Sequence, residues 1–240
     1  VLAKQAVDNK FYPIPGQTRT NISVESGDGP PTVFAEKGPQ VSNEDWDRFL
    51  HRFESLSKDA LWVALGGSLP PGLPDEAYRD LLLVARDKGA RVLLDADGGP
   101  MKSGLLAKPD MVKPNRDEAT RLLAKDIRTL DEARKAAIDI RAHLSDLGVA
   151  IVSMGSMGAA MAFPGGSAIA HGVAVQARST IGSGDSLLGA VLARSCHGDD
   201  WPTCLRWGTA SGAATAESNG SDIGRRPEIE RLLPQVRLEL

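Results

Sequence analysis

Short hydrophobic runs alternate with amphipathic segments along the chain from about residue 60 onward. Runs of this length, bounded by glycine, proline or acidic residues, are typical of buried strands. The amphipathic segments repeat apolar side chains every three or four positions, which predicts helices with one buried face. The expected strands are 60–67, 91–97, 110–115, 149–155, 159–164 and 167–175, and the expected helices are 74–88, 116–123, 131–147 and those that follow Asp185 and Trp201. Strands that alternate with helices predict a parallel sheet covered by helices on both faces.

The segment before this alternation predicts a small hairpin. Residues 20–36 contain two extended pieces, NISVES and PTVFAE, and a turn rich in glycine at 26–30 joins them. A helix is expected from Ser42 to about Leu56, because a serine cap and early acidic residues favour a helix start. We expect residues 1–240 to form a single α/β domain, in which the hairpin 20–36 serves as a lid.

The composition argues against several classes of protein. With 42% hydrophobic and 25% charged residues, the chain has the balance of an ordinary soluble globular domain. Its net charge of -3 gives no electrostatic reason to bind nucleic acid or an acidic membrane, and no apolar run approaches the ~20 residues of a membrane span. The two cysteines, Cys196 and Cys204, do not make a disulfide framework, and the four histidines lack metal-ligand spacing. Because we also recognise no secretory leader, we expect a cytoplasmic protein.

Residues 176–189, QARSTIGSGDSLLG, carry the first candidate chemistry. They predict a strand end, a glycine turn and the start of a helix that Ser183 or Asp185 caps. The first amide N–H groups of a helix lack intrahelical partners and carry partial positive charge, so such a turn is suited to bind an anion. Asp185 would then take a proton from a hydroxyl while the turn holds a phosphoryl group. The alternative is a capped structural turn, which is the commoner origin of a short motif of this kind.

Other glycine-rich or polar turns follow the expected strands. They are 66–72 (GGSLPPG), 113–115 (KPN) and 153–155 (SMG). In an open parallel sheet, ligands bind beyond the carboxyl ends of the strands, so these turns and the turn at 182–185 are expected to share one rim. The glycine spacing matches neither the dinucleotide-binding fingerprint nor a Walker A loop. A nucleotide at this rim would therefore be held in a different way.

Four motifs follow one another in the order GGSLPPG, KPNRDE, VSMGSMGA and STIGSGDS. Together they resemble those of the ribokinase-like PfkB carbohydrate kinases. The earlier segment GQTRTNI resembles the phosphofructokinase and tagatose-6-phosphate kinase branch of that family, especially the 1-phosphofructokinases. The resemblance extends from Val1 to about Ile223. It implies a ribokinase-like three-layer αβα fold with a mostly parallel central sheet, and an ATP-dependent kinase that uses Mg²⁺.

The resemblance also implies roles for individual residues. Asp185 matches the catalytic base of the family, and Gly182, Ser183 and Gly184 match its anion hole. The family usually has alanine at position 183, a difference that backbone N–H donors tolerate. The positions that match nucleotide contacts are Lys113, Asn115, Ser153, Gly155 and Gly158, and Asn115 and Glu118 match the N-x-x-E motif that organises Mg²⁺ through water. Ordinary turn chemistry and a capped helix start are the alternative interpretations of these residues.

The remaining matches concern the substrate and a monovalent cation. Arg19 matches an arginine that contacts the phosphate already present on the sugar, for which a guanidinium is well suited. Ser68 matches a substrate-contacting serine. Ser179 and Ile181, together with the turn 218–221, match a loop pair that holds a monovalent cation such as K⁺ in some members of the family.

Relatives begin with further strand–helix units, so the resemblance implies that the N-terminal portion of the family fold is absent here. A chain that starts at Val1 would expose an edge of its sheet, and weak activity is then expected. The expected reaction converts fructose 1-phosphate to fructose 1,6-bisphosphate, and tagatose 6-phosphate and fructose 6-phosphate are alternative acceptors. Alternatives of other classes are a truncated, non-catalytic nucleotide- or sugar-binding protein and a structural module. The expected partners are ATP, a sugar phosphate and a second copy of the chain bound through the lid, with no nucleic acid or membrane.

Overall fold

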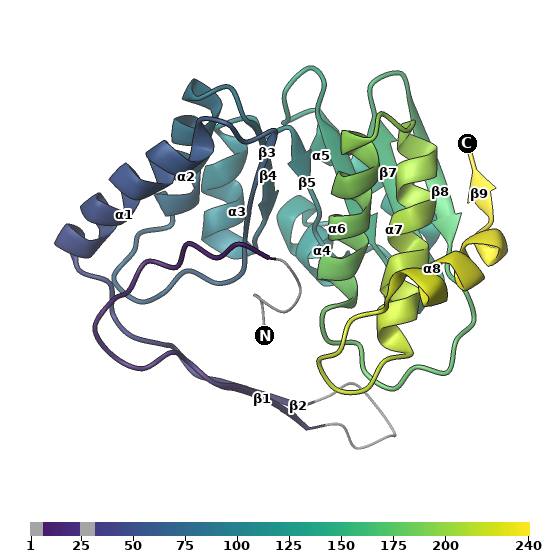
Figure 1. Cartoon of the computed structure of the whole chain (residues 1–240). Coiled ribbons are helices and arrows are strands. Elements are labelled where there is room, and N and C mark those ends of the chain that lie inside the picture. The colour runs from purple at the N-terminus through teal and green to yellow at the C-terminus, as the bar shows by residue number, and fades with distance from the viewer. Residues whose placement is uncertain (1–6, 25–31) are drawn as a thin grey trace.

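The structure is a computed structural model that describes residues 7–24 and 32–240. Within these residues, a seven-stranded sheet has the strand order β3-β4-β5-β6-β7-β8-β9 (Figure 1). Its strands are β3 (Trp62–Gly66), β4 (Arg91–Asp95), β5 (Met111–Val112), β6 (Val149–Ser153), β7 (Gly158–Phe163), β8 (Gly166–His171) and β9 (Leu238–Glu239). All but the short C-terminal strand β9 overlap the expected hydrophobic runs.

The sheet is mixed, with parallel pairing confined to strands β3 to β6. Strands β7, β8 and β9 pair antiparallel with their neighbours. Only a short 3₁₀ turn, Gly155–Met157, separates β6 from β7. Because parallel neighbours need a crossover of a dozen or more residues, this connection allows only an antiparallel pair. The expected α/β fold is confirmed.

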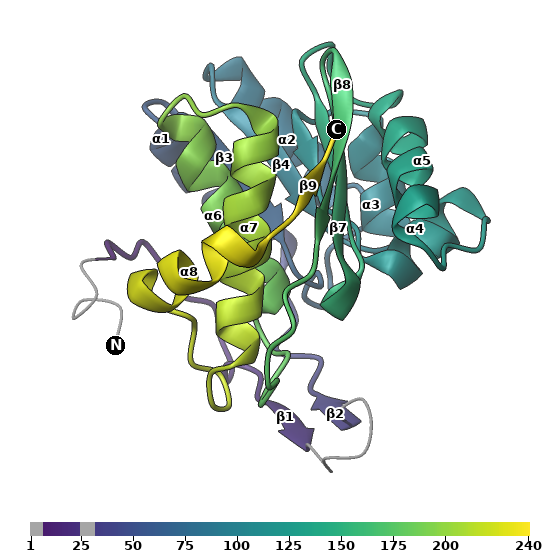
Figure 2. The ribbon, with the colours of Figure 1, turned by 90° about the vertical axis from the view of Figure 1, so that its right-hand side faces the viewer.

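Helices cover both faces of the sheet (Figures 1 and 2). One face packs against α1 (Asn43–Ser57), α2 (Ala77–Asp87), α3 (Gly98–Leu105), α4 (Arg116–Leu123) and α5 (Leu130–Arg141), and the other packs against α6 (Ser183–Cys196), α7 (Trp201–Ala216) and α8 (Arg226–Leu232). Alternate residues of one strand enter the two cores: Val92 and Leu94 face the first layer of helices and Leu93 faces the second. None of the helices in the described residues is long and apolar enough to cross a membrane.

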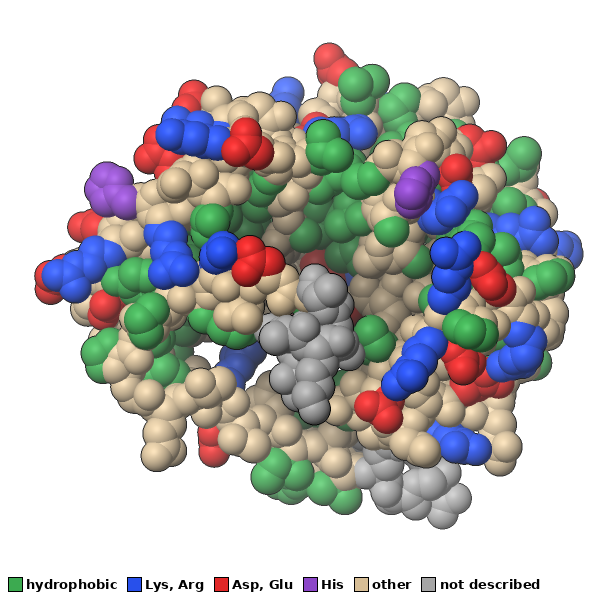
Figure 3. All heavy atoms as spheres, viewed as in Figure 1, with side chains coloured by type: hydrophobic (Ala, Val, Ile, Leu, Met, Phe, Trp, Pro, Cys, Tyr) green, Lys and Arg blue, Asp and Glu red, His purple; other side chains and the backbone are tan. Residues whose placement is uncertain are grey.

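The hairpin consists of β1 (Asn21–Val24) and β2 (Thr32–Ala35), which pair antiparallel as expected. It projects from the three-layer body (Figure 1). Ile22 is paired with Phe34, so both side chains lie on the same face, and they are 56% and 61% exposed. Figure 3 shows hydrophobic side chains at the lower edge of the molecule, where the hairpin lies. The expected turn at 26–30 lies outside the described residues.

Two sequence predictions about the elements were wrong. Helix α5 was expected to reach residue 147, but it ends at Arg141, whose guanidinium donates 2.9 Å hydrogen bonds to the carbonyls of Asp146 and Gly148. This turn returns the chain to the start of β6. The strand expected over 167–175, with a continuation to residue 179, was too long, because β8 ends at His171 and residues 172–179 belong to no strand. Instead, the amide of Arg178 donates to the carbonyl of Ala216 at the end of α7, at 2.7 Å.

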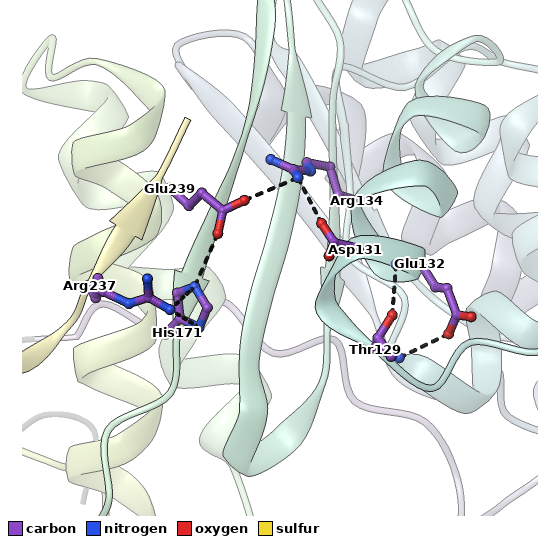
Figure 4. Close-up of polar contacts among 7 residues, drawn as sticks. All are labelled: Thr129, Asp131, Glu132, Arg134, His171, Arg237 and Glu239. Atoms are coloured by element: carbon purple, nitrogen blue, oxygen red, sulfur yellow. Dashed lines mark hydrogen bonds and ion pairs between the residues drawn. The ribbon is translucent and has the colours of Figure 1, made fainter.

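Strand β9 is attached to the sheet edge through polar contacts as well as backbone pairing (Figure 4). Glu239 lies 3.1 Å from Arg134 on α5 and 3.5 Å from His171 at the end of β8. Arg134 also pairs with Asp131 in the first turn of α5, at 2.7 Å. A hydrogen bond of 2.8 Å joins Arg237 to the ring of His171. The C-terminal segment therefore closes the side of the body farthest from β3.

Candidate active site

The first turn of α6 presents free backbone donors. Gly182 occupies the N-cap position with a left-handed φ of 74°, and no side chain caps the helix, so the expected cap by Ser183 or Asp185 was wrong. The amide of Ser183 donates to Thr180, whereas those of Gly184 and Asp185 have no acceptor within the described part of the chain. The side chain of Asp185 is exposed beside these amides. This arrangement suits an anion with a carboxylate at its edge.

A buried ion pair lies next to this turn. The Nζ atom of Lys113, which follows β5, is 3.1 Å from Oδ2 of Asp95 at the end of β4, and the two side chains are 6% and 19% exposed. A Cβ atom at Gly184 would lie 3.4 Å from the same Nζ atom. Burial raises the pKa of the Asp95 carboxyl, the charge of Lys113 opposes this, and the charge of Asp185 adds to it. The KPN turn and the glycine turn therefore meet at one place.

The SMG turn is adjacent to the KPN turn. Asn115 and Ser153 form an isolated parallel bridge, and the amide of Ser153 donates to the carbonyl of Pro114 at 3.1 Å. Gly158 has a φ of 116°, and a Cβ atom there would lie 2.0 Å from the carbonyl oxygen of Ala170. Only glycine fits this position. The five residues predicted to contact nucleotide, Lys113, Asn115, Ser153, Gly155 and Gly158, thus lie along adjoining turns of one rim.

Asn115 and Glu118 form a complete capping box at the start of α4. Asn115 Oδ1 accepts from the amide of Glu118 at 3.0 Å, and Glu118 Oε2 accepts from the amide of Asn115 at 2.8 Å. Burial raises the pKa of the Glu118 carboxyl, and the hydrogen bond from Asn115 opposes that shift. The helix-start interpretation of these residues is therefore correct, and a role in holding Mg²⁺ would have to be additional. No group of three or more His, Cys, Asp or Glu side chains in the described ranges is placed to enclose a metal ion.

A pocket of about 720 Å³ opens beside this rim. Arg19 and Ser68, 49 positions apart in the sequence, both line it, and Arg19 Nη1 donates a hydrogen bond of 2.5 Å to Ser68 Oγ. Lys37 also lines the pocket. The lining carboxylates are Glu36, Asp75, Asp95, Asp97 and Glu118. The pocket therefore carries both cations and carboxylates, and Glu36 lies beside Arg19, because its Oε2 atom accepts from the amide of Thr20 at 2.7 Å.

Some predicted residues lie outside the pocket lining. Asp185 and the glycine turn adjoin it through Asp95, and Ser153, Gly155 and Gly158 lie farther along the rim. The loop of Ser179 and Ile181 lies beside the end of α7: the amide of Ile181 donates to Ser179 Oγ at 3.3 Å, and Arg178 Nη1 donates to Asn219 Oδ1 at 3.3 Å. The loop pair proposed for a monovalent cation is thus brought together.

Two residues of the pocket lining, Asp95 and Lys37, were not among the sequence predictions. Asp95 is the last residue of β4, so the rule that ligands bind at the carboxyl ends of strands was sufficient to identify it. Lys37 lies in a segment without regular secondary structure after β2, where no spacing distinguishes it from a solvated lysine.

The mixed sheet with helices on both faces is a ribokinase-like α/β fold. A family model described as "pfkB family carbohydrate kinase" matches residues 1–228. The chain belongs to this family of ATP-dependent carbohydrate kinases.

Individual relatives give the same assignment. The 1-phosphofructokinase of Rhodobacter capsulatus is 34% identical over 226 residues, which cover 93% of this chain and 70% of the relative. The 1-phosphofructokinase of Bacillus subtilis is 29% identical over 239 residues, covering 99% and 76%. Among solved structures, phosphofructokinase-2 of Escherichia coli in complex with substrates and products is 24% identical with a TM-score of 0.87, covering 98% of this chain and 76% of that one. These comparisons support the fold and the family together.

Proposed function

We propose that the chain transfers the γ-phosphoryl group of ATP to the C6 hydroxyl of fructose 1-phosphate, giving fructose 1,6-bisphosphate and ADP. The observation that carries the proposal is the Arg19–Ser68 pair in the lining of the pocket. A guanidinium beside a hydroxyl suits a phosphate that is already on the sugar. The relatives named 1-phosphofructokinase, at 29% and 34% identity, favour this acceptor over tagatose 6-phosphate or fructose 6-phosphate.

In this mechanism, Asp185 accepts the proton of the attacking hydroxyl. The hydroxyl oxygen bonds to the γ-phosphorus as the bond from that phosphorus to the β–γ bridging oxygen breaks. The unpaired amides of Gly184 and Asp185 stabilise the charge that develops on the transferring group. The nucleotide is held along the rim by Lys113, Asn115, Ser153, Gly155 and Gly158. Mg²⁺, which keeps much of its water shell, would neutralise phosphate charge beside Glu118 and Asn115.

The proposal is tested by ADP release with each of the three sugar phosphates, alongside equilibrium binding of ATP. We expect the highest kcat/KM with fructose 1-phosphate. Asp185→Asn should lower kcat by about 10²–10⁴-fold with nearly unchanged ATP affinity, which is the range for loss of a general base. ATP binding without turnover would instead favour the non-catalytic binding protein, and the absence of ATP binding would favour a structural module.

Arg19→Ala tests the acceptor end of the site. It should raise the KM for the sugar phosphate far more than the KM for ATP, because the guanidinium is expected to contact only the acceptor phosphate. Arg48→Ala is the matched control, since Arg48 is exposed on α1 and pairs with Glu44 on the same helix. An equal rise in both Michaelis constants for Arg19→Ala would contradict the proposed phosphate contact.

We also propose a homodimer formed through the hairpin. Ile22, Val24 and Phe34 lie on one face of it and are at least half exposed. Phe34→Asp should convert the dimer to a monomer in light scattering, whereas Asn21→Asp on the opposite face should not. A wild-type protein that remains monomeric at high concentration would contradict this proposal.

The loop of Ser179 and Ile181 is proposed to hold K⁺. Its packing beside the turn 218–221, through the Arg178–Asn219 hydrogen bond, supports this role. Turnover should rise when K⁺ replaces tetramethylammonium at constant ionic strength. Equal turnover in both salts would exclude a K⁺ requirement.

A further inference from the structure

The turn that carries Ser68 is held from two sides. Strand β3 ends at Gly66, and Gly67 then adopts a φ of +86°, a conformation that favours glycine. On one side, the amide of Gly67 donates to the carbonyl of Asp95 at 3.2 Å. On the other side, the hydroxyl of Tyr78 lies 2.7 Å from the carbonyl oxygen of Gly66 and 3.0 Å from that of Gly67. One phenolic hydrogen therefore serves two consecutive carbonyls.

Tyr78 reaches this turn from inside the protein. It lies in the first turn of α2 and is 7% exposed, with its ring in the core between α2 and the sheet. Burial raises the pKa of its hydroxyl, and the charge of Arg19 opposes this shift. Without the phenolic hydrogen, two carbonyls at the end of β3 would lose a donor, and such groups are costly to leave unpaired.

The next residue after these two carbonyls is Ser68, whose Oγ atom accepts from Arg19 at 2.5 Å. A rotation of the Gly66 or Gly67 peptide would move Ser68 relative to Arg19. Tyr78 itself is not part of the pocket lining in the described residues. Its influence on the pocket is transmitted through the turn.

We propose that Tyr78 is a positioning residue for the acceptor phosphate: its hydroxyl fixes the Gly66–Gly67 turn and thereby sets the geometry of the Ser68–Arg19 pair. This inference rests on the proposed function, in which that pair grips the phosphate of the sugar. The Tyr78 hydroxyl is thus expected to affect binding of the sugar phosphate and not binding of ATP. A tyrosine with a purely structural role would affect stability but not discriminate between the two substrates.

The sequence contains a matched control, because its two tyrosines are Tyr12 and Tyr78. The ring of Tyr12 makes an edge contact with Phe49, with centroids 6.1 Å apart, away from the pocket. Tyr78→Phe should raise the KM for the sugar phosphate about tenfold, the effect of one lost hydrogen bond, and leave the KM for ATP within about twofold. Tyr12→Phe should change neither. Partial unfolding would lower the active fraction, and hence kcat, without producing this selective rise in KM.

A double-mutant cycle with Ser68→Ala tests the route of the effect. If Tyr78 acts through Ser68, Tyr78→Phe should add less than about twofold to the KM of the Ser68→Ala variant. The inference would be overturned if the two substitutions raised the sugar-phosphate KM independently, so that the rise in the double variant equalled the product of the two single rises. An unchanged sugar-phosphate KM in Tyr78→Phe would also overturn it. The wild-type protein separates this failure from failure of the proposed function: if it neither phosphorylates nor binds any of the three sugar phosphates in calorimetry, the proposed function itself is wrong.

Discussion

Lys113 Nζ lies 3.1 Å from Asp95 Oδ2 at the rim of the sheet, and both side chains are largely buried. The same ammonium group approaches the position that a Cβ atom of Gly184 would occupy, to 3.4 Å. The Lys113 ammonium group therefore lies beside the first turn of α6. Three segments far apart in the sequence meet at this ion pair: the ends of β4 and β5 and the start of α6.

Breaking this pair should destabilise the protein strongly. Lys113→Met leaves the Asp95 carboxylate buried without its partner, and the expected loss in the free energy of unfolding is about 3–5 kcal/mol near neutral pH. Lys135→Met, which removes an exposed lysine of α5, is the control and should have little effect. Urea denaturation of both variants makes the comparison. Equal stabilities would show that the ion pair is not effectively buried.

The pH dependence of the same variant has a definite sign. Burial already raises the pKa of Asp95 above its ordinary value of 3.8, so the folded protein holds this proton more tightly than the unfolded chain. Stability therefore falls as the pH rises from about 3.8 through the folded pKa. Without Lys113 that pKa should rise further, so the stability deficit of Lys113→Met should shrink as the solution is acidified toward pH 4. A deficit independent of pH would contradict this account.

The rim was predictable from the sequence because strand ends are marked by local chemistry. Lys113 and Ser153 each follow a short buried run, and parallel strands bring such ends together. The contact between Arg19 and Ser68 was not predictable from the sequence pattern, since no periodicity relates a loop residue to one 49 positions away. Only the family resemblance connected these two residues. Tyr78 was hidden for a different reason. In an amphipathic helix its aromatic ring is an ordinary core residue, and the sequence does not reveal where its hydroxyl points.

Ser183→Ala should stabilise the protein. The Ser183 hydroxyl is buried and has no hydrogen-bond partner within the described residues. Its removal should raise the free energy of unfolding by about 1 kcal/mol, because a buried polar group without a hydrogen bond is costly. The control lies on the same helix: Ser186 Oγ accepts from Thr215 Oγ1 at 2.8 Å, so Ser186→Ala should be destabilising. Kinase turnover of Ser183→Ala should be unchanged, because the proposed anion hole uses backbone amides. A stability loss in Ser183→Ala would show that the hydroxyl has a partner in solution.

Glu118→Gln should separate helix capping from metal binding. Glutamine still accepts from the Asn115 amide, so α4 should remain capped. Loss of the carboxylate should raise the Mg²⁺ concentration needed for half-maximal turnover about tenfold or more, because second-sphere contacts change metal affinity by that much. Glu132→Gln is the control, since Glu132 forms the corresponding capping box with Thr129 at the start of α5 (Figure 4). A magnesium titration of both variants is the measurement. If the two variants required the same Mg²⁺ concentration for half-maximal turnover, Glu118 would have only a capping role.

These two capping boxes should also respond to pH with opposite signs. Burial raises the pKa of Glu118, so its ionisation above about pH 4.5 reduces stability, and Glu118→Gln should gain relative to wild type as the pH rises. Hydrogen bonds from the amides of Arg128 and Thr129 lower the pKa of Glu132. Its ionised form therefore stabilises the fold above about pH 4.5, and that stabilisation is lost as the pH falls through the folded pKa. Thermal melts from pH 4 to 7.5 should show the two variants diverging in opposite directions from wild type.

The two cysteines should differ in both reactivity and pH response. Cys204 is buried, and burial raises the pKa of its thiol to about 12, from an ordinary value of 9.0, whereas Cys196 is exposed. The unfolded chain releases the Cys204 proton first, so the folded state is disfavoured above about pH 9, by about 1.4 kcal/mol at pH 10. Cys204→Ala should remove this loss of stability at high pH, even if the smaller side chain lowers stability at every pH. Cys196→Ala should retain it.

A thiol reagent at pH 8 should label Cys196 rapidly and Cys204 only at the rate of unfolding. Equal labelling of both thiols, or identical pH slopes in the two variants, would show that Cys204 is accessible to solvent in the folded protein.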